Sequence, residues 1–241
     1  MKPISDLIWE GLDHLGLSGV AANVRNRLRA AGLIKWKPLV PPDAFTGCIL
    51  DLIRALEERG QSLGAYVEFG VSRGTSMACS FQALKQTGHD DVRLVGFDSF
   101  EGMPPGSEAE GWQAGDYRST IDQTRAHLEK HGADNKRIEL VKGWFSDTCN
   151  VETRKRLGLD RVSIAMIDCD IYSATVEALD FVKPMLTEHA VLIFDDWGWM
   201  EDKGAKGQKE AFEEFIARHA GWQVSPLPAY RPEARVFLLK R

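Results

Sequence analysis

The sequence predicts a doubly wound α/β fold, in which helices cover both faces of a mainly parallel sheet. From residue 65 onward, short runs of β-branched and aromatic residues alternate with longer stretches whose apolar residues recur every three or four positions. This alternation is typical of parallel sheets, because each parallel strand needs a crossover connection. The chain has 241 residues, 44% of them hydrophobic and 27% charged, which suits one such domain with additional helices.

Five segments are expected to form parallel strands, and two more a closing hairpin at the C-terminus. The hairpin would add an antiparallel edge and bring the sheet to seven strands. Amphipathic helices are expected between the strands. The parallel strands are predicted at 65–71, 92–100, 137–145, 162–172 and 190–197, the hairpin strands at 222–228 and 234–241, and helices at 120–132, 173–186 and 208–219.

The N-terminal part of the chain has a different pattern. Residues 1–60 contain no comparable strand, and we expect them to form a helical segment ahead of a domain of residues 61–241. This segment would act as a cap or lid, or provide a homodimer contact. The loop 101–118 is acidic and rich in glycine, which suits a mobile lid but also a plain surface insertion.

Composition excludes several function classes. The formal net charge of -5 gives no general attraction for nucleic acid. No apolar run is long enough to span a membrane, and the N-terminus lacks the apolar segment of a signal peptide, so we expect a cytoplasmic protein. The four cysteines are far apart, as expected for buried thiols and not for a zinc site or disulfide framework: Cys48, Cys79, Cys149 and Cys169.

Acidic residues gather at the predicted carboxyl ends of the strands. In an open parallel sheet this is the edge at which ligands bind. None of the six histidines is predicted there, so acid–base chemistry would depend on carboxylates and not on imidazole. The strand-end acids are Glu68, Asp98, Asp168, Asp170, Asp195 and Asp196.

The turn after the first strand indicates a nucleoside-type ligand. Gly70 and Gly74 would leave room for the ligand and turn backbone N–H groups toward it, with Arg73 and Thr75 in the same turn. The spacing is not that of the dinucleotide fingerprint, and Glu68 would repel a pyrophosphate but attract an ammonium group. The alternative is that the glycines only form a tight turn and that Glu68 caps a helix.

Asp98, at the end of the second predicted strand, is placed to accept hydrogen bonds from ribose hydroxyls. An ammonium group and a ribose together indicate S-adenosylmethionine.

A second group of acids, Asp168, Asp195 and Asp196, would meet if the fourth and fifth strands are neighbours. With no evident Lys or Arg partner these carboxylates would repel one another, and oxygen ligands favour Mg²⁺. The alternative is that Asp168 or Asp195 caps the following helix.

Five blocks in this order resemble the macrocin O-methyltransferase family: "VEFGVSRGTS", "GFDSFEGMP", "VKGWFSDT", "MIDCDIYSATVEAL" and "LIFDDWG". That family comprises Rossmann-like class I methyltransferases that act on sugar hydroxyls of macrolide-type natural products. The resemblance covers about residues 60 to 220. Residues 1–60 and the loop 101–118 match the family pattern poorly, so the resemblance predicts the cofactor and the metal better than the acceptor.

The resemblance implies a role for each matching residue. Asp168 would be a metal ligand, would lie beside the cofactor, and would also be the catalytic residue that receives or orients the acceptor proton. Trp144 has the alternative reading of a core aromatic. By this resemblance Glu68 and Gly70 meet the methionine part of S-adenosylmethionine, Asp98 and Ser99 the ribose, and Gly143 and Trp144 the adenine, while Asp168, Asp195 and Asp196 bind Mg²⁺.

The expected reaction is transfer of the sulfonium methyl group to a hydroxyl of a small molecule, a sugar or glycosylated metabolite. Alternatives are a phenol or carboxylate acceptor, and a non-catalytic protein that binds S-adenosylmethionine. An NAD-dependent oxidoreductase fits the glycine spacing poorly. A metal-dependent hydrolase would leave the glycine turn unexplained.

Overall fold

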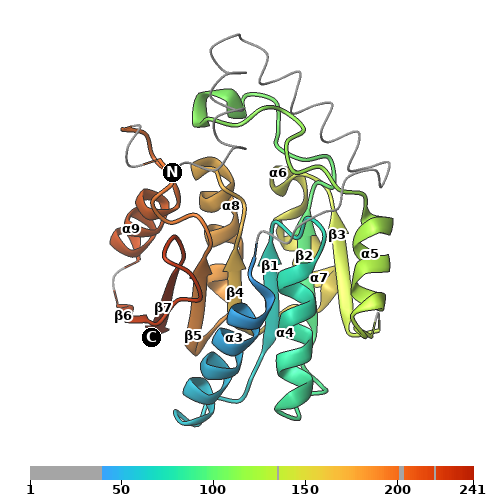
Figure 1. Ribbon diagram of the computed structural model, residues 1–241. Coiled ribbons are helices and arrows are strands. Elements are labelled where there is room, and N and C mark those ends of the chain that lie inside the picture. The colour runs from blue at the N-terminus through green and yellow to red at the C-terminus, as the bar shows by residue number, and fades with distance from the viewer. Residues whose placement is uncertain (1–39, 135, 201–203, 220) are drawn as a thin grey trace, which may run out of the picture. The chain divides into compact units, whose positions relative to one another are not determined.

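The computed structural model describes residues 40–134, 136–200, 204–219 and 221–241. Its seven strands form one sheet in the order β3-β2-β1-β4-β5-β7-β6 (Figure 1). The first five strands are parallel, and β7 pairs antiparallel with both β5 and β6, so the predicted fold class and closing hairpin are confirmed. The strands are β1 Ala65–Phe69, β2 Leu94–Asp98, β3 Ile138–Lys142, β4 Val162–Ile167, β5 Leu186–Phe194, β6 Gln223–Leu227 and β7 Arg235–Lys240.

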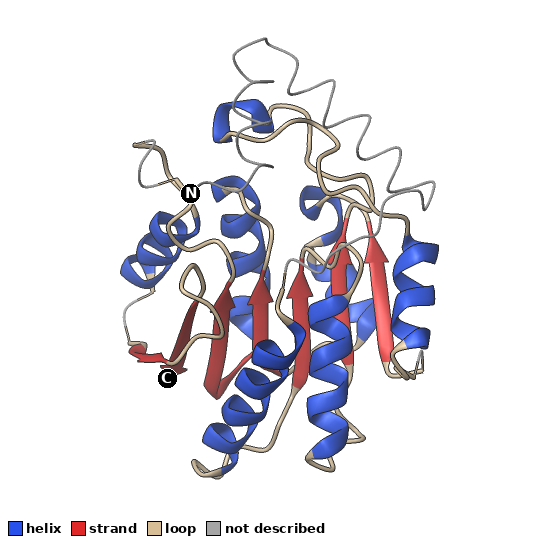
Figure 2. Ribbon diagram, in the orientation of Figure 1, coloured by secondary structure: helices blue, strands red, loops and turns tan. Residues whose placement is uncertain are grey.

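Helices cover both faces of the sheet (Figure 2). One apolar cluster joins α3, α4 and α5 to one face, and a second joins α6, α7, α8 and α9 to the other. The central strand β4 is buried at every position, as expected for a parallel strand between two helical layers. The helices are α3 Pro42–Glu57, α4 Thr75–Gln86, α5 Ile121–Lys130, α6 Phe145–Thr148, α7 Val151–Leu157, α8 Tyr172–Val182 and α9 Gln208–Arg218.

The register of the central strands brings their carboxyl ends to one level. Phe69 of β1 pairs with Phe97 of β2 and with Ile167 of β4. Ile167 in turn pairs with Phe194 of β5. The residues that directly follow these four lie along a single edge of the sheet: Gly70, Asp98, Asp168 and Asp195.

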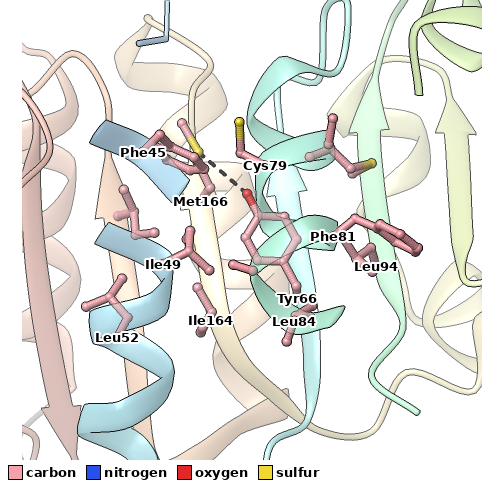
Figure 3. Close-up of a cluster of buried hydrophobic side chains, with 14 of the residues drawn as sticks. Phe45, Ile49, Leu52, Tyr66, Cys79, Phe81, Leu84, Leu94, Ile164 and Met166 are labelled. Atoms are coloured by element: carbon pink, nitrogen blue, oxygen red, sulfur yellow. Dashed lines mark hydrogen bonds between the residues drawn. The ribbon is translucent and has the colours of Figure 1, made fainter. Parts of the chain in front are cut away.

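The helix α3 belongs to the core of the sheet domain. Its buried residues, Phe45 and Ile49 among them, pack with β1 and α4 in the cluster drawn in Figure 3. The compact unit that contains the sheet begins at Pro38, so the described part of the expected N-terminal segment shares its core with the sheet. Residues 1–39, which make up most of the expected helical segment, lie outside the described residues. The cap or dimer role of that segment stays a prediction.

Residues 101–119 belong to a separate compact unit with its own internal bonds. The N–H of Met103 donates to the Asp116 carbonyl at 2.8 Å, and the N–H of Gly115 donates to the Met103 carbonyl at 2.9 Å. The rings of Trp112 and Tyr117 meet edge to face, with their centroids 5.2 Å apart. These contacts give the segment a defined local structure, and its expected role as a lid stays a prediction.

Element ends differ most from the predictions at β4 and β5. The strand β5 begins at Leu186, earlier than the predicted residue 190, because the polar residues Thr187 to His189 do not look like a strand, although Leu186 pairs with β4 and His189 with β7. The strand β4 ends at Ile167, and the acidic residues that follow it form the turn into α8. Within the described residues, no helix combines the length and apolar character needed to cross a membrane.

Candidate active site

Gly70 is fixed by the neighbouring strand. Its φ is +91°, and a Cβ placed there would lie 1.7 Å from the carbonyl oxygen of Asp168. Its N–H donates to the carbonyl of Phe97 at 2.9 Å. The steric requirement for glycine therefore comes from the backbone that directly follows β4, which was not expected from the sequence, and the expected ligand contact of Gly70 stays a prediction.

Glu68 is enclosed between β1 and α4. Its two carboxylate oxygens accept hydrogen bonds from the hydroxyl of Tyr66 at 2.6 Å and from that of Ser76 at 2.7 Å. The residue has no exposed surface, and burial raises its pKa to about 8. The carboxylate therefore joins the end of β1 to the first turn of α4, and its expected contact with an ammonium group stays a prediction.

The turn into α4 has an open helix N-terminus. Gly74 is the N-cap with φ of +80° and no side-chain capping bond. The first backbone N–H groups of a helix have no partner within it and carry partial positive charge. The hydroxyl oxygen of Thr75 is buried and, within the described residues, has no hydrogen-bond partner. Arg73 precedes this helix and is partly exposed.

Asp98 organises the end of β2. Its carboxylate accepts from the N–H of Ser72 at 2.7 Å and from the N–H of Phe100 at 2.6 Å. Its carbonyl accepts from the N–H of Gly143 at 3.0 Å. Burial raises its pKa above the ordinary value for an aspartate, while the backbone donors act in the opposite direction. Asp98 thus ties the ends of β1, β2 and β3 together, and Ser99 follows it on the same edge.

Gly143 and Trp144 lie where β3 passes into α6. Gly143 has φ of +145°, and a Cβ there would lie 2.7 Å from a methyl carbon of Thr148. Trp144 is the N-cap of α6, and its carbonyl accepts from the N–H of Thr148 at 3.0 Å. The Trp144 side chain is only partly buried, so it does not have the enclosure of a core aromatic.

The structure brings together the three carboxylates predicted to converge. Asp168, Asp195 and Asp196 each offer an oxygen, and these oxygens lie within 4.8 Å of one another. Burial raises the pKa of Asp168 well above its ordinary value, and repulsion from Asp195 and Asp196 adds to this. Burial and repulsion from Asp195 raise the pKa of Asp196 to about 7. We call these residues the acidic trio.

The acidic trio has a cationic partner, and the expectation of none is wrong. The Nη2 group of Arg231 donates to Oδ2 and to the backbone carbonyl of Asp195, the latter at 3.1 Å, and lies 3.4 Å from Oδ1 of Asp196. Arg231 lies in the connection between β6 and β7. A signal was available in the sequence, because a hairpin antiparallel to β5 must place its connection at the carboxyl end of that strand.

The oxygens of the acidic trio that Arg231 does not reach fit a hard divalent cation. The Oδ1 atom of Asp195 and the Oδ2 atom of Asp196 are buried and receive no N–H or hydroxyl hydrogen bond in the described part of the chain, and the carboxyl groups of Asp168 and Asp170 lie beside these two residues. An unsatisfied buried carboxylate oxygen is costly unless it is protonated or binds a cation. Carboxylate oxygens without nitrogen or sulfur donors are the ligand set of Mg²⁺.

Two further residues border the acidic trio. Asp170 has φ of +61°, and burial together with repulsion from Asp196 raises its pKa well above the ordinary value. The side chain of Gln208 accepts from the N–H of Asp196 at 2.9 Å and donates to the carbonyl of Ile167 at 3.1 Å. Nothing in the sequence distinguishes Gln208, which is one polar residue at the start of the helix predicted at 208–219.

Solved structures share this fold. The O-methyltransferase NovP superposes with a TM-score of 0.65 at 19% identity, over 82% of this chain and 80% of that chain. The calicheamicin methyltransferase CalS11 superposes with a TM-score of 0.62 at 21% identity, over 79% of this chain and 77% of that chain. Both similarities support the class I methyltransferase architecture of the sheet and its helices.

Sequence relatives extend the comparison. The 8-demethyl-8-(2,3-dimethoxy-alpha-L-rhamnosyl)-tetracenomycin-C 4'-O-methyltransferase of Streptomyces olivaceus is 31% identical over 56% of this chain and 53% of its own length. This chain therefore matches about half of that relative. The family described as Macrocin-O-methyltransferase (TylF) matches residues 51–220, which contain both the glycine turn and the acidic trio. The chain belongs to the macrocin O-methyltransferase family.

Proposed function

We propose that this protein is an S-adenosylmethionine-dependent O-methyltransferase that requires Mg²⁺ and acts on a sugar hydroxyl of a glycosylated natural product. The observation that carries the proposal is the pair of buried, unpartnered carboxylate oxygens of Asp195 and Asp196, on the same sheet edge as the glycine turn. A nucleoside-type turn and a divalent-cation site at one edge suit a transfer between two bound small molecules.

We assign S-adenosylmethionine to residues at the ends of β1, β2 and β3. The turn from Gly70 through Arg73 to Thr75 offers the N-terminus of α4 and the unpartnered hydroxyl of Thr75. Asp98 and Ser99 would receive the ribose hydroxyls. Glu68 is assigned to the methionine end of the cofactor, and Gly143 and Trp144 are assigned to the adenine end.

We assign the metal ion to the acidic trio. Asp168, Asp195 and Asp196 would hold Mg²⁺, with the unpartnered oxygens as ligands. When bound, S-adenosylmethionine supplies an electrophilic methyl group, and Mg²⁺ lowers the pKa of a hydroxyl that it contacts. A carboxylate oxygen of Asp168 would receive or orient the acceptor proton.

The names of related proteins support the acceptor class. The Streptomyces olivaceus relative is named for a rhamnosyl tetracenomycin, and one from Micromonospora griseorubida is a mycinamicin III 3''-O-methyltransferase. The chain matches 53% and 61% of their lengths, so their acceptors are guides to the chemical class only. We therefore propose a sugar hydroxyl without naming the compound or the position methylated.

The test is methyl transfer from methyl-labelled S-adenosylmethionine to a panel of glycosylated, phenolic and carboxylate acceptors, followed by mass detection. We expect one labelled methyl group on a glycosylated acceptor, loss of product on chelation, and recovery with Mg²⁺. The Asp195→Asn variant should lose the response to Mg²⁺. Transfer to phenols or carboxylates alone would refute the sugar class, and full turnover with chelator would refute the metal.

A further inference from the structure

We propose that Arg231 is a positioning residue of the metal site, which orients the two carboxylates of Asp195 and Asp196 so that their remaining oxygens face a divalent cation. This inference rests on the proposed metal dependence. It goes beyond that proposal because it assigns a role to a residue of the β6–β7 connection, far along the chain from the acidic trio.

The bonds of Arg231 divide the oxygens of the two carboxylates into two sets. Arg231 takes Oδ2 of Asp195 and Oδ1 of Asp196. The other oxygen of each carboxylate is the buried one that has no hydrogen-bond partner among the described residues. Each carboxylate thus has one oxygen engaged by the guanidinium and one left for another cation. If Arg231 instead competed with a metal ion for these carboxylates, its guanidinium would be expected to bind the oxygens that the metal needs.

The bonds also fix the main chain. The same Nη2 group donates to the carbonyl of Asp195, so Arg231 holds both the backbone and the side chain of this residue. The next bond along the chain runs from the N–H of Trp197 to the carbonyl of Glu233 at 3.1 Å. The β6–β7 connection therefore contacts the chain on both sides of Asp196, which limits the rotation of the two carboxylates.

Arg231 is itself held by anchored neighbours. Tyr230 is buried and packs edge to face on Phe45 of α3, with ring centroids 4.8 Å apart. Ala234 has no exposed surface. The side chain of Arg231 is 20% exposed. A substitution at Arg231 should therefore leave the hairpin in place and change mainly the two aspartates.

The carboxylates outnumber the guanidinium and leave negative charge for a divalent cation. The acidic trio carries three negative charges when ionised and Asp170 beside it a fourth, and Arg231 compensates one of them. Residues that hydrogen-bond to metal-ligating carboxylates commonly contribute about 10- to 100-fold to metal affinity. All the bonds to the two aspartates come from one nitrogen, Nη2, which the planar guanidinium holds in a fixed orientation, whereas a lysine ammonium acts as a point charge on a flexible stem.

The experiment measures binding of Mn²⁺ alone, by calorimetry or by the electron paramagnetic resonance of the free ion, to the full chain. We expect Arg231→Met to weaken binding about 10- to 100-fold and Arg231→Lys to recover only part of the loss. Arg218→Met is the matched control, because it removes one positive charge from an exposed ion pair with Asp180 and should leave Mn²⁺ affinity unchanged. All variants should retain their affinity for S-adenosylmethionine, since the bonds of Arg231 to Asp195 and Asp196 lie at the carboxyl end of β5, whereas the glycine turn follows β1.

The outcomes separate this inference from the proposed function. If the native chain binds Mn²⁺ and Arg231→Met binds it equally or more tightly, Arg231 competes with the metal ion, and the positioning role alone is overturned. Full recovery by Arg231→Lys would overturn the requirement for a guanidinium group. Mn²⁺ binding that is absent in the native chain, or unaffected by Asp195→Asn, would overturn the proposed metal site and this inference with it.

Discussion

Gly70 lies against the carbonyl of Asp168, so closely that a Cβ on Gly70 would be 1.7 Å from its oxygen. The N–H of Asp168 donates to the carbonyl of Phe69 at 2.8 Å. The end of β1, which begins the glycine turn proposed to bind the cofactor, is therefore in direct contact with the residue that begins the acidic trio. The two halves of the site share one backbone junction, and a change at Gly70 should affect both.

Gly70→Ala should destabilise the protein by about 3 kcal/mol or more, because the new methyl meets a carbonyl and an L residue is strained at a φ of +91°. Affinities for S-adenosylmethionine and for Mn²⁺ should fall together. Gly47→Ala is the matched control: it has open space around its Cβ position and lies inside α3, so alanine should stabilise by about 0.5 to 1 kcal/mol. Urea unfolding measures both changes. A Gly70→Ala protein with native stability and native Mn²⁺ affinity would contradict the shared junction.

Glu68→Gln should alter the dependence of stability on pH in the cofactor-free protein. The folded pKa of Glu68 is raised to about 8 from an ordinary value of 4.5, so the folded state retains a proton that the unfolded state releases between these values. The native chain should therefore lose up to about 1.4 kcal/mol of stability per pH unit from this group as pH rises through that window. Glutamine cannot ionise, so the free energy of unfolding of the variant should gain on that of the native chain between pH 5 and pH 8. Parallel curves would refute the raised pKa.

Asp98→Asn should weaken the β1–β2 junction and cofactor binding. The native carboxylate accepts from two backbone N–H groups, of Ser72 and Phe100, whereas an amide offers only one oxygen. We expect a loss of about 1 to 3 kcal/mol in stability and at least a tenfold loss in S-adenosylmethionine affinity. Asp90→Asn, which changes an exposed ion pair with Arg137, should change neither quantity appreciably. Native affinity in a folded Asp98→Asn protein would remove Asp98 from the cofactor site.

Phe45→Ala should destabilise the fold by about 3 to 5 kcal/mol, because a fully buried ring is removed from the core. It should also weaken Mn²⁺ binding, since Phe45 supports Tyr230, the residue before Arg231. Phe45→Leu should recover most of the stability and much of the Mn²⁺ affinity, and it provides the test if the alanine variant does not fold. Native Mn²⁺ affinity in both variants would show that α3 does not determine the position of the hairpin connection.

The general plan of the fold could be predicted because it depends on local patterns. The alternation of apolar strands and amphipathic helices located all seven strands and the closing hairpin. The convergence of Asp168 with Asp195 followed from the carboxyl ends of neighbouring strands. Strand ends were less predictable, since the polar start of β5 becomes a strand through pairing with β4 at Leu186 and with β7 at His189.

The residues that sequence reasoning missed act through contacts between distant segments. Arg231 lies 36 positions beyond Asp195, in a turn whose local sequence resembles any proline-containing connection. Gly70 was correctly singled out, but its steric reason depends on β4 lying next to β1, which the alternation of elements does not specify. The bond between Tyr66 and Glu68 joins residues two apart on one strand face and could have been expected from the strand period.

We propose that one edge of the sheet binds a sulfonium nucleoside beside a divalent ion. An anomalous difference map tests this, from a crystal grown with Mn²⁺ and with S-adenosylhomocysteine in place of the sulfonium cofactor. We predict a Mn²⁺ peak within coordination distance of oxygens from Asp168, Asp195 and Asp196, with the ribose on Asp98. A peak elsewhere, or a nucleoside bound away from the turn between Gly70 and Thr75, would contradict the account.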